Sequence, residues 1–198
     1  MGYYVRVLST SAGCVSVSQL RSALASNQLN GVLNVEEGSD EDWTQIILSH
    51  VNGRAIASLE RNVVQEGSLG ADELAEFAEE VIDCKPASAA QWLLEYFRRV
   101  KCIYAFQVLS GTYEGDGWEI LGAIKECIWS AAPAILQADN EGFSNEAGYH
   151  ILWQFNDSVD GPWWMAVLRD GRWKQFQMNL GDRKQRESFL RGEVPSDV

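Results

Sequence analysis

Residues 43–59, WTQIILSHVNGRAIASL, contain the clearest structural signal in the chain. Two runs rich in apolar residues flank the dipeptide Asn52-Gly53, which supplies the two positive-φ positions of a type I′ turn. The pattern predicts a β-hairpin that closes at this dipeptide. Both faces of its first strand carry apolar side chains, which is typical of a central hairpin that is covered on both sides.

The flanking sequence extends this hairpin into a larger fold. Alternating residues predict strands at 3–8 and 32–35, joined by a helix that Ser16 or Ser18 would cap. A second helix is predicted at 72–83, and a third is predicted to start at Ser88, with Gln91 completing a capping box. The helix at 72–83 is amphipathic, and its apolar stripe consists of Leu74, Phe77, Ala78, Val81 and Ile82.

The C-terminal half contains further strands and turns. Strands are predicted at 102–109, 134–138, 149–155, 163–169 and 172–180, and helices at 118–130 and after Asp182. The last two strands meet at Asp170-Gly171, a second type I′ signal. Because hairpins join most neighbouring strands and the helices occur in clusters, we expect an α+β fold. Its sheet or sheets would be largely antiparallel, with helices packed on them and a hairpin in each half.

The connection at 66–70 is polar and contains glycine, so it is the best candidate for a boundary within the chain. It would separate an N-terminal β-α-β-β-β subdomain, residues 1–66, from an aromatic-rich α+β subdomain, residues 68–198. The alternative is one continuous domain, because a chain of 198 residues is short enough to form a single core.

Eight tryptophans occur in the chain, and seven of them lie between Trp92 and Trp173. Most are expected to pack helices onto a sheet, as for Trp118, or to pair across strands. Trp163 and Trp164 differ, because consecutive residues of a strand point to opposite faces. If one of those faces is open, the indole ring on it is exposed, and an exposed tryptophan marks a binding surface.

Composition and motifs exclude several classes of function. No run approaches 18 apolar residues and the first residues lack a secretory signal, so we expect a cytoplasmic protein. The four cysteines form no close pair of the kind that binds zinc, so we expect reduced thiols and no metal. Nucleophile and nucleotide motifs such as GxSxG, SxxK, GxGxxG and the Walker loop are absent, and no cofactor is expected.

Charge points to a binding partner. The formal net charge of −12 disfavours nucleic-acid binding, and thirteen acids against two arginines lie between residues 36 and 83. We therefore hypothesise a non-enzymatic, immunity- or regulator-like module, monomeric or homodimeric, that binds a basic protein. A nuclease toxin held by an acidic immunity protein is an analogy from charge alone; a merely solvated surface is the alternative. The expected partner-binding residues are Glu36, Glu37, Asp40, Glu41, Asp42, Glu73, Glu76, Glu79 and Glu80.

The alternative function is an enzyme or a small-ligand-binding protein that uses the polar segment 139–150. Its carboxylates and imidazole could act as acid and base if they converge, although no spacing rule enforces this. The segment is not an EF-hand, because Phe143 and Ser144 replace the required oxygen ligand and glycine, respectively. The candidate catalytic residues are Asp139, Glu141, Glu146 and His150, with Tyr149, Trp153 and Trp164 as aromatic walls of a pocket.

Overall fold

The computed structural model describes residues 2–156 and 158–196 of the chain. Helices and antiparallel strands form an α+β fold, which confirms the expected fold class. The chain divides into two compact units. One contains Met1–Ala71 and Val100–Ala134, and the other contains Asp72–Arg99 and Ile135–Val198. We call them the first unit and the second unit.

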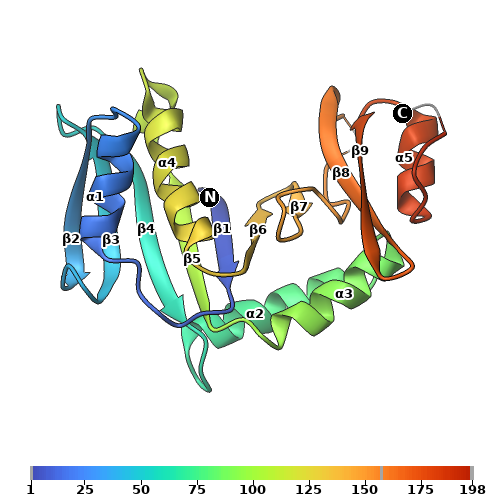
Figure 1. Cartoon of the computed structure of the whole chain (residues 1–198), viewed down its shortest axis with the longest axis horizontal. Helices are drawn as coiled ribbons and strands as arrows, with labels where there is room; N and C mark the ends of the chain where they lie inside the picture. Colours follow the sequence, from blue (N-terminus) through green and yellow to red (C-terminus); the bar gives the residue numbers. More distant parts are fainter. Residues whose placement is uncertain (1, 157, 197–198) are drawn as a thin grey trace. The chain divides into compact units, whose positions relative to one another are not determined.

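The first unit contains five strands. They are β1 (Tyr3–Ser9), β2 (Gly31–Gly38), β3 (Trp43–His50), β4 (Ala55–Val63) and β5 (Cys102–Val108). These strands pair antiparallel in the order β2-β3-β4-β5-β1 (Figure 1). Because β3 and β4 each have a neighbour on both edges, the predicted hairpin lies in the interior of the sheet. Strand β4 pairs with β5 along most of its length, although residues 64–101 separate the two strands in sequence.

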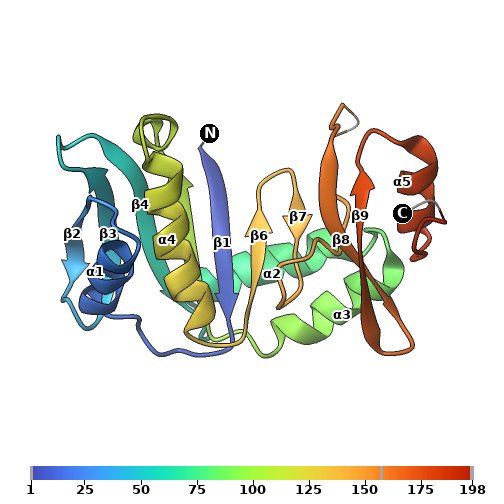
Figure 2. The same ribbon diagram turned by 45° about the horizontal axis from the view of Figure 1, so that its top comes forward.

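Two helices, α1 (Val17–Ser26) and α4 (Gly117–Ser130), pack side by side on one face of this sheet (Figure 2). Their inward-facing residues are fully or almost fully buried, including Leu24 and Ile120. The two helices meet over Gly31 of β2. A Cβ atom at Gly31 would lie 2.9 Å from Cγ2 of Ile120 and 3.0 Å from Cδ1 of Leu24. The missing side chain of Gly31 therefore leaves the space into which both helices pack.

The turn between β3 and β4 differs from the predicted type I′ turn. Gly53 has a φ of 84°, but Asn52 does not adopt a positive φ. The N–H of Gly53 donates to the carbonyl of His50 at 2.9 Å, and the N–H of His50 donates to the carbonyl of Arg54 at 3.0 Å. These bonds enclose a three-residue loop, in which a type I turn is followed by a glycine bulge. The hairpin is confirmed, whereas the turn type was wrong.

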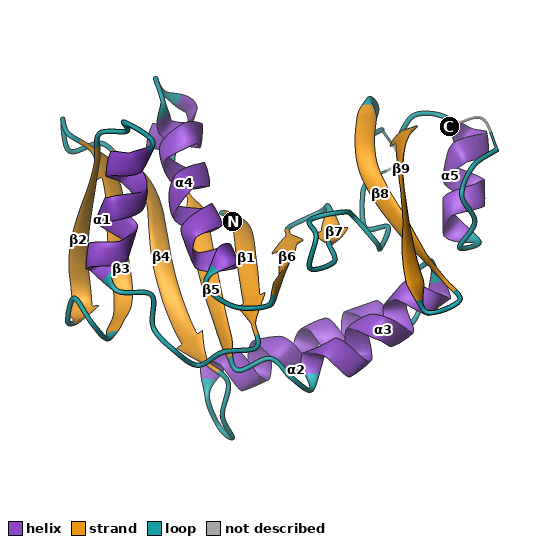
Figure 3. Cartoon of the chain, viewed as in Figure 1, coloured by secondary structure: helices purple, strands orange, loops and turns teal. Residues whose placement is uncertain are grey.

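The second unit combines helices with the short strands β6 and β7 and the longer hairpin β8-β9 (Figure 3). Its elements are α2 (Leu69–Val81), α3 (Ala87–Phe97), β6 (Ala134–Ala138), β7 (Gly142–Phe143), β8 (Pro162–Arg169), β9 (Arg172–Asn179) and α5 (Arg183–Leu190); α2 and β6 begin in the last residues of the first unit. Asp170 and Gly171, between β8 and β9, have φ values of 52° and 72°, which confirms the second type I′ turn. One face of this hairpin forms a core with Phe155 and Phe189.

One predicted strand and one predicted helix cap are wrong. Residues 149–155 do not form a strand, because only isolated bridges occur there, at His150, and the N–H of Trp153 donates to the carbonyl of Lys85. Ser88 does not cap α3. Pro86 occupies the N-cap position, and its carbonyl accepts hydrogen bonds from the N–H groups of Ala89 and Ala90. Helix α3 therefore begins earlier than the capping-box pattern indicated.

Two apolar residues are exposed against expectation. Ile82 was assigned to the buried stripe of its helix, but α2 ends at Val81 and Ile82 lies on the surface. Trp118 was expected to pack a helix onto the sheet. It lies in the first turn of α4, where 46 % of its surface is exposed. Most other tryptophans pack as expected; Trp92, for example, meets Trp173 edge to face at 5.2 Å.

The two compact units do not follow a single division of the chain at residues 66–70, because each unit contains two separate stretches of sequence. The chain leaves the first unit after Ala71, close to that connection, but residues 100–134 return to the first unit. Strand β5 and helix α4 thus belong to the same compact unit as the N-terminal strands. Within residues 2–156 and 158–196, no helix has the length and apolar character needed to cross a membrane.

Candidate functional site: an anchored acidic segment

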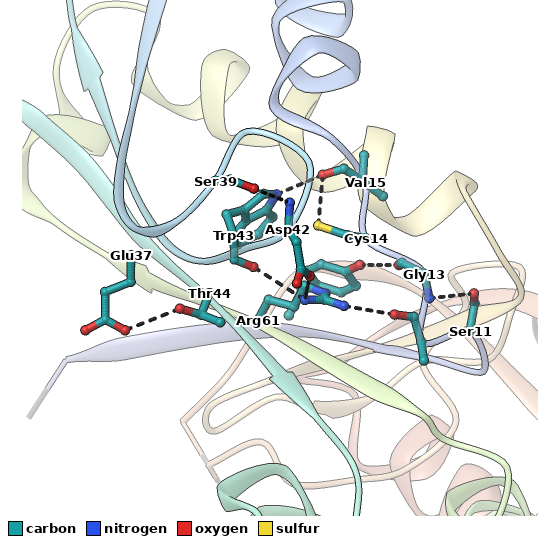
Figure 4. Close-up of polar contacts among 12 residues, drawn as sticks. Ser11, Gly13, Cys14, Val15, Glu37, Ser39, Asp42, Trp43, Thr44 and Arg61 are labelled. Atoms are coloured by element: carbon teal, nitrogen blue, oxygen red, sulfur yellow. Dashed lines mark hydrogen bonds and ion pairs between the residues drawn. The ribbon is translucent and has the colours of Figure 1, made fainter.

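The acidic segment, residues 36–42, connects two strands of the first unit (Figure 4). Strand β2 continues to Gly38, so Glu36 and Glu37 lie at the end of the strand and not in a loop. Ser39 and Asp42 exchange backbone hydrogen bonds of 3.3 and 3.2 Å, which close a tight turn. Gly38 has a φ of 92°, and a Cβ atom there would collide with the carbonyl of Asp42. This turn therefore requires glycine at its entrance.

A buried arginine holds the segment to the sheet. Arg61 projects from β4, and only 8 % of its side chain is exposed. Its Nη1 atom donates to Oδ1 of Asp42 at 2.9 Å and lies 3.5 Å from the carbonyl of Trp43, while its Nη2 atom donates to the carbonyl of Ala12 at 2.9 Å. The guanidinium thus joins β4, the acidic segment and the segment before α1. Asp42 itself is 78 % exposed, so the carboxylate remains available to solvent.

Two aromatic side chains reinforce this anchor. The indole Nε1 of Trp43 donates to the carbonyl of Val15 at 2.8 Å, and the hydroxyl of Tyr104 donates to the carbonyl of Gly13 at 2.9 Å. The two rings pack with their centroids 5.8 Å apart. The segment before α1, residues 12–15, is therefore held by three side chains of the sheet. Hydrogen bonds from these three side chains favour one conformation of the segment, although the buried Nε atom of Arg61 has no hydrogen-bond partner.

Burial favours the protonated form of the cysteine thiols in this region. Burial raises the pKa of the Cys102 thiol to about 11, and burial also raises the pKa of Cys14. Both thiols therefore stay protonated near neutral pH, and the thiolate is the reactive form. Cys102 packs in the core, and the thiol of Cys14 donates to the carbonyl of Val15 at 3.6 Å.

The acidic segment keeps a net negative charge. The Nη1 atom of Arg21 lies 3.2 Å from Oδ2 of Asp40, and the Nη1 atom of Arg61 lies 2.9 Å from Oδ1 of Asp42. Two of the five carboxylates of residues 36–42 therefore have a cationic partner. Among the residues that the structure describes, the other three have no cationic partner: Glu37 accepts a hydrogen bond from the hydroxyl of Thr44 at 3.3 Å, whereas Glu36 and Glu41 have no partner, and all three are exposed. A backbone with a fixed conformation thus presents two unpaired carboxylates at the end of β2 and β3.

The predicted acids of α2 belong to the second unit. Glu76, Glu79 and Glu80 are exposed, and Glu73 is half-buried. The sequence-based hypothesis joined these residues and the acidic segment into one surface. The structure assigns the two groups to different compact units, and each is therefore considered separately.

The residues of the alternative catalytic site occupy different local environments in the second unit. Asp139 and Glu141 lie in the turn between β6 and β7, where the N–H of Glu141 donates to the carbonyl of Ala138. Glu146 lies at the tip of a turn that the side chain of Asn145 organises, and its Oε1 atom is 3.9 Å from Nη2 of Arg99.

His150 lies among aromatic rings. The indole Nε1 of Trp163 donates to Nδ1 of His150 at 2.9 Å, so Nδ1 is an acceptor and the neutral ring carries its proton on Nε2. That Nε2 atom is buried and has no hydrogen-bond partner. The ring also packs against Phe155, with centroids 5.2 Å apart. Burial alone lowers the pKa of His150 to about 4, so the imidazole is neutral near pH 7.

Two of the three proposed aromatic wall residues come together. Tyr149 and Trp164 meet at right angles, with centroids 6.0 Å apart, and Trp164 is 57 % exposed. Trp163 points the other way, toward His150, as expected for consecutive residues of a strand. Trp153 lies apart from this pair, in the core, where Arg186 covers its ring at 4.7 Å.

Sequence reasoning missed Arg61, which organises the acidic segment. The available signal was its position in a strand, because Arg61 follows the buried Leu59 on the same face of β4. Within the described residues, no three His, Cys, Asp or Glu side chains gather in a way that could hold a metal ion. No family model, curated protein or solved structure matches the chain.

Proposed function

We propose that the chain is a non-enzymatic protein-binding module whose acidic segment binds a basic surface of a partner protein, as an immunity protein or regulator would. One observation carries the proposal: a buried arginine binds the carboxylate of Asp42 and the carbonyl of Trp43 at the end of the acidic segment, while Glu36 and Glu41 stay exposed and unpaired among the described residues. The four free cysteines fit a reducing compartment such as the cytoplasm.

The physical advantage of such a segment is preorganisation. A flexible acidic loop loses conformational entropy when it is ordered by a partner, and this loss weakens binding. The turn at Ser39 and Asp42 and the bonds of Arg61 impose that order before binding. Exposed carboxylates on a fixed backbone also attract a basic partner over a distance, which raises its association rate at low salt.

The test is the salt dependence of the association rate. A basic partner that is captured with the wild-type chain is measured by stopped-flow mixing over a range of salt concentrations, with wild type and with the double variant Glu36→Lys/Glu41→Lys. We expect the variant to associate about tenfold or more slowly at low salt and to show a shallower salt dependence.

A matched variant separates the acidic segment from overall charge. Glu76→Lys/Glu79→Lys changes the net charge by the same amount but lies on α2 in the second unit. We expect this variant to associate nearly as fast as the wild type. Equal slowing in both double variants would mean that total charge, and not the anchored segment, controls binding; an association rate independent of salt would remove the role of the acids altogether.

Small-ligand binding at Tyr149 and Trp164 is a second candidate function. The observation that favours it is the exposed, perpendicular ring pair, which offers an aromatic face to a planar or sugar-like ligand. Trp164→Leu is expected to abolish binding of such a ligand without changing the association rate of the basic partner. Retained ligand binding in this variant would exclude the pair as the site.

A further inference from the structure

Residues 113–119, YEGDGWE, place two exposed aromatic rings next to one another in the first unit. Tyr113 ends the short 3₁₀ helix η1 (Ser110–Tyr113), and Trp118 lies in the first turn of α4. The ring centroids are 5.6 Å apart and the ring planes are nearly perpendicular, at 88°. Tyr113 is 68 % exposed and Trp118 46 %. Large rings that stay this exposed contribute little to the core and are typical of binding surfaces.

The backbone beneath the two rings is closely packed. Thr112, between Gly111 and Tyr113, is buried, and its hydroxyl donates to the carbonyl of Ile56 in β4. A Cβ atom at Gly111 would reach within 2.9 Å of the carbonyl carbon of Ala55, and one at Gly117 would collide with the carbonyl of Gly111. The two segments that carry Tyr113 and Trp118 are therefore held against β4 and against each other, so the rings form a preorganised corner.

Three carboxylates lie next to these rings in the sequence. Asp116 and Glu119 are exposed. Glu114 already binds the guanidinium of Arg54, whose Nη2 atom lies 2.7 Å from Oε1 of Glu114. The N-terminus of α4 favours negative charge, which accounts for Asp116 and Glu119 by helix electrostatics alone. Helix electrostatics does not account for the two exposed rings. Rings and carboxylates together are the groups that attract an organic cation.

We propose that Tyr113 and Trp118 form a binding corner for an arginine side chain of a partner protein, with Asp116 and Glu119 supplying the opposite charge. A planar guanidinium stacks on an aromatic face and is more weakly hydrated than an ammonium group, so arginine is preferred to lysine. The choice of a basic protein as the source of this arginine rests on the function proposed above.

The corner and the acidic segment are separate sites. The acidic segment joins the end of β2 to the start of β3, whereas the corner lies beside the last residue of β3, His50. The Nε2 atom of His50 lies 2.8 Å from the carbonyl oxygen of Gly111, and its Nδ1 atom lies 3.6 Å from Oδ1 of Asp116. Figure 2 shows these as opposite ends of the same sheet. One basic partner would therefore need two cationic regions to engage both sites at once.

The test uses N-acetylarginine amide as the probe and the whole chain labelled with ¹⁵N. The indole N–H resonance of Trp118 is followed during titration, and N-acetylcitrulline amide, which has nearly the same shape without the charge, is titrated in parallel. We expect a saturable shift of the Trp118 resonance with the arginine probe, a weaker one with N-acetyllysine amide, and none with the citrulline probe. Asp116→Asn and Tyr113→Leu are each expected to weaken binding roughly twofold to fivefold.

Trp164 provides an internal control, because it also forms an exposed perpendicular pair, but Gln177 and not a carboxylate lies opposite it on β9. Its indole resonance is expected not to move. The proposal is overturned if citrulline shifts Trp118 as much as arginine does, or if Trp164 responds equally. The double variant Glu36→Lys/Glu41→Lys keeps the corner intact, so its binding of the arginine probe should be unchanged even if the acidic segment proves to have no partner.

Discussion

Arg61 is the single residue whose removal should most disturb the acidic segment. Replacing it with methionine keeps the apolar stem but removes the N–H groups that donate to the carboxylate of Asp42, the carbonyl of Trp43 and the part-buried carbonyl of Ala12. Losing the hydrogen bonds of a buried, charged donor costs free energy, so Arg61→Met is expected to lower the free energy of unfolding by roughly 2 kcal/mol. Urea unfolding followed by tryptophan fluorescence measures this change.

Arg21 provides the matched control for Arg61. It also pairs with an acid of the segment, Asp40, but both side chains are more than half exposed. Surface pairs of this kind contribute little, so Arg21→Met should change the free energy of unfolding by less than about 0.5 kcal/mol. Similar losses in the two variants would contradict the view that burial makes Arg61 the anchor.

His150 should make the stability of the chain depend on pH. Burial lowers its folded-state pKa to about 4, below the ordinary value of about 6.5 for an unfolded chain. As pH falls, the unfolded chain binds the proton first, and the folded state loses stability between about pH 6.5 and pH 4. The expected loss from this group is about 3 kcal/mol, and it is measured by urea unfolding at pH 7, 5 and 4.

The variant His150→Gln isolates this contribution. Glutamine can still accept a hydrogen bond from Trp163 but does not titrate in this range. Other groups also lose stability in acid, so the decisive quantity is the difference between the two unfolding curves. That difference should shrink steadily toward pH 4. A constant difference across the pH range would show that His150 does not titrate at the lowered pKa.

Alternation along the chain explains which single residues could be predicted. Trp163 and Trp164 are consecutive strand residues, so one of them had to face away from the core, and Trp164 does. The convergence of Asp139, Glu141, Glu146 and His150 had no such rule behind it. Side chains from a long connection are positioned by contacts with distant residues, such as Arg99 for Glu146 and Trp163 for His150, and these contacts cannot be read locally.

The two S-x-x-Q sequences show how context decides where a helix begins. Ser16 and Gln19 form a reciprocal capping box at α1, whereas Ser88 and Gln91 do not cap α3. Pro86 lies two residues before Ser88, and its carbonyl starts the helix from the N-cap position. Ser88 therefore lies inside the first turn of α3, where its hydroxyl does not cap the helix.

A pair of serine variants tests this difference. Ser16→Ala removes the acceptor for the N–H of Gln19 and should lower the free energy of unfolding by about 1 kcal/mol. Ser88→Ala should change it by less than about 0.5 kcal/mol, because alanine is at least as good a helix former as serine. Urea unfolding compares the two, and equal losses would argue against the assigned start of α3.

The two predicted hairpin turns have similar sequences but different conformations. Asn52-Gly53 and Asp170-Gly171 look equivalent in sequence, yet only the second forms a two-residue type I′ turn. The register of the strands decides the outcome: Arg169 pairs directly with Arg172, whereas His50 bonds to Arg54 across three residues. The turn residues predict both hairpins, and the register of the paired strands decides which turn type forms.

The compact units could not be predicted because they are not continuous in sequence. Strand β4 finds its partner in β5 only after residues 64–101, and Gly31 of β2 packs against Ile120 of α4. Periodicity identifies strands and helices but says nothing about which distant elements pair. A boundary placed at a polar connection therefore separates elements that the sheet joins.

This arrangement predicts that residues 1–66 do not fold by themselves. Without β5 and α4, strand β4 has an unpaired edge and the face that Ile120 covers becomes exposed, so the fragment should show no cooperative urea transition. A shortened chain in which a glycine-serine linker joins residue 66 to residue 100 and which ends at residue 134 should fold cooperatively. The linker needs to span little distance, because the N–H of Val64 donates to the carbonyl of Lys101 at 2.9 Å. Circular dichroism and urea unfolding compare the two chains; a cooperative transition in residues 1–66 alone would mean that β5 and α4 are dispensable to the first unit.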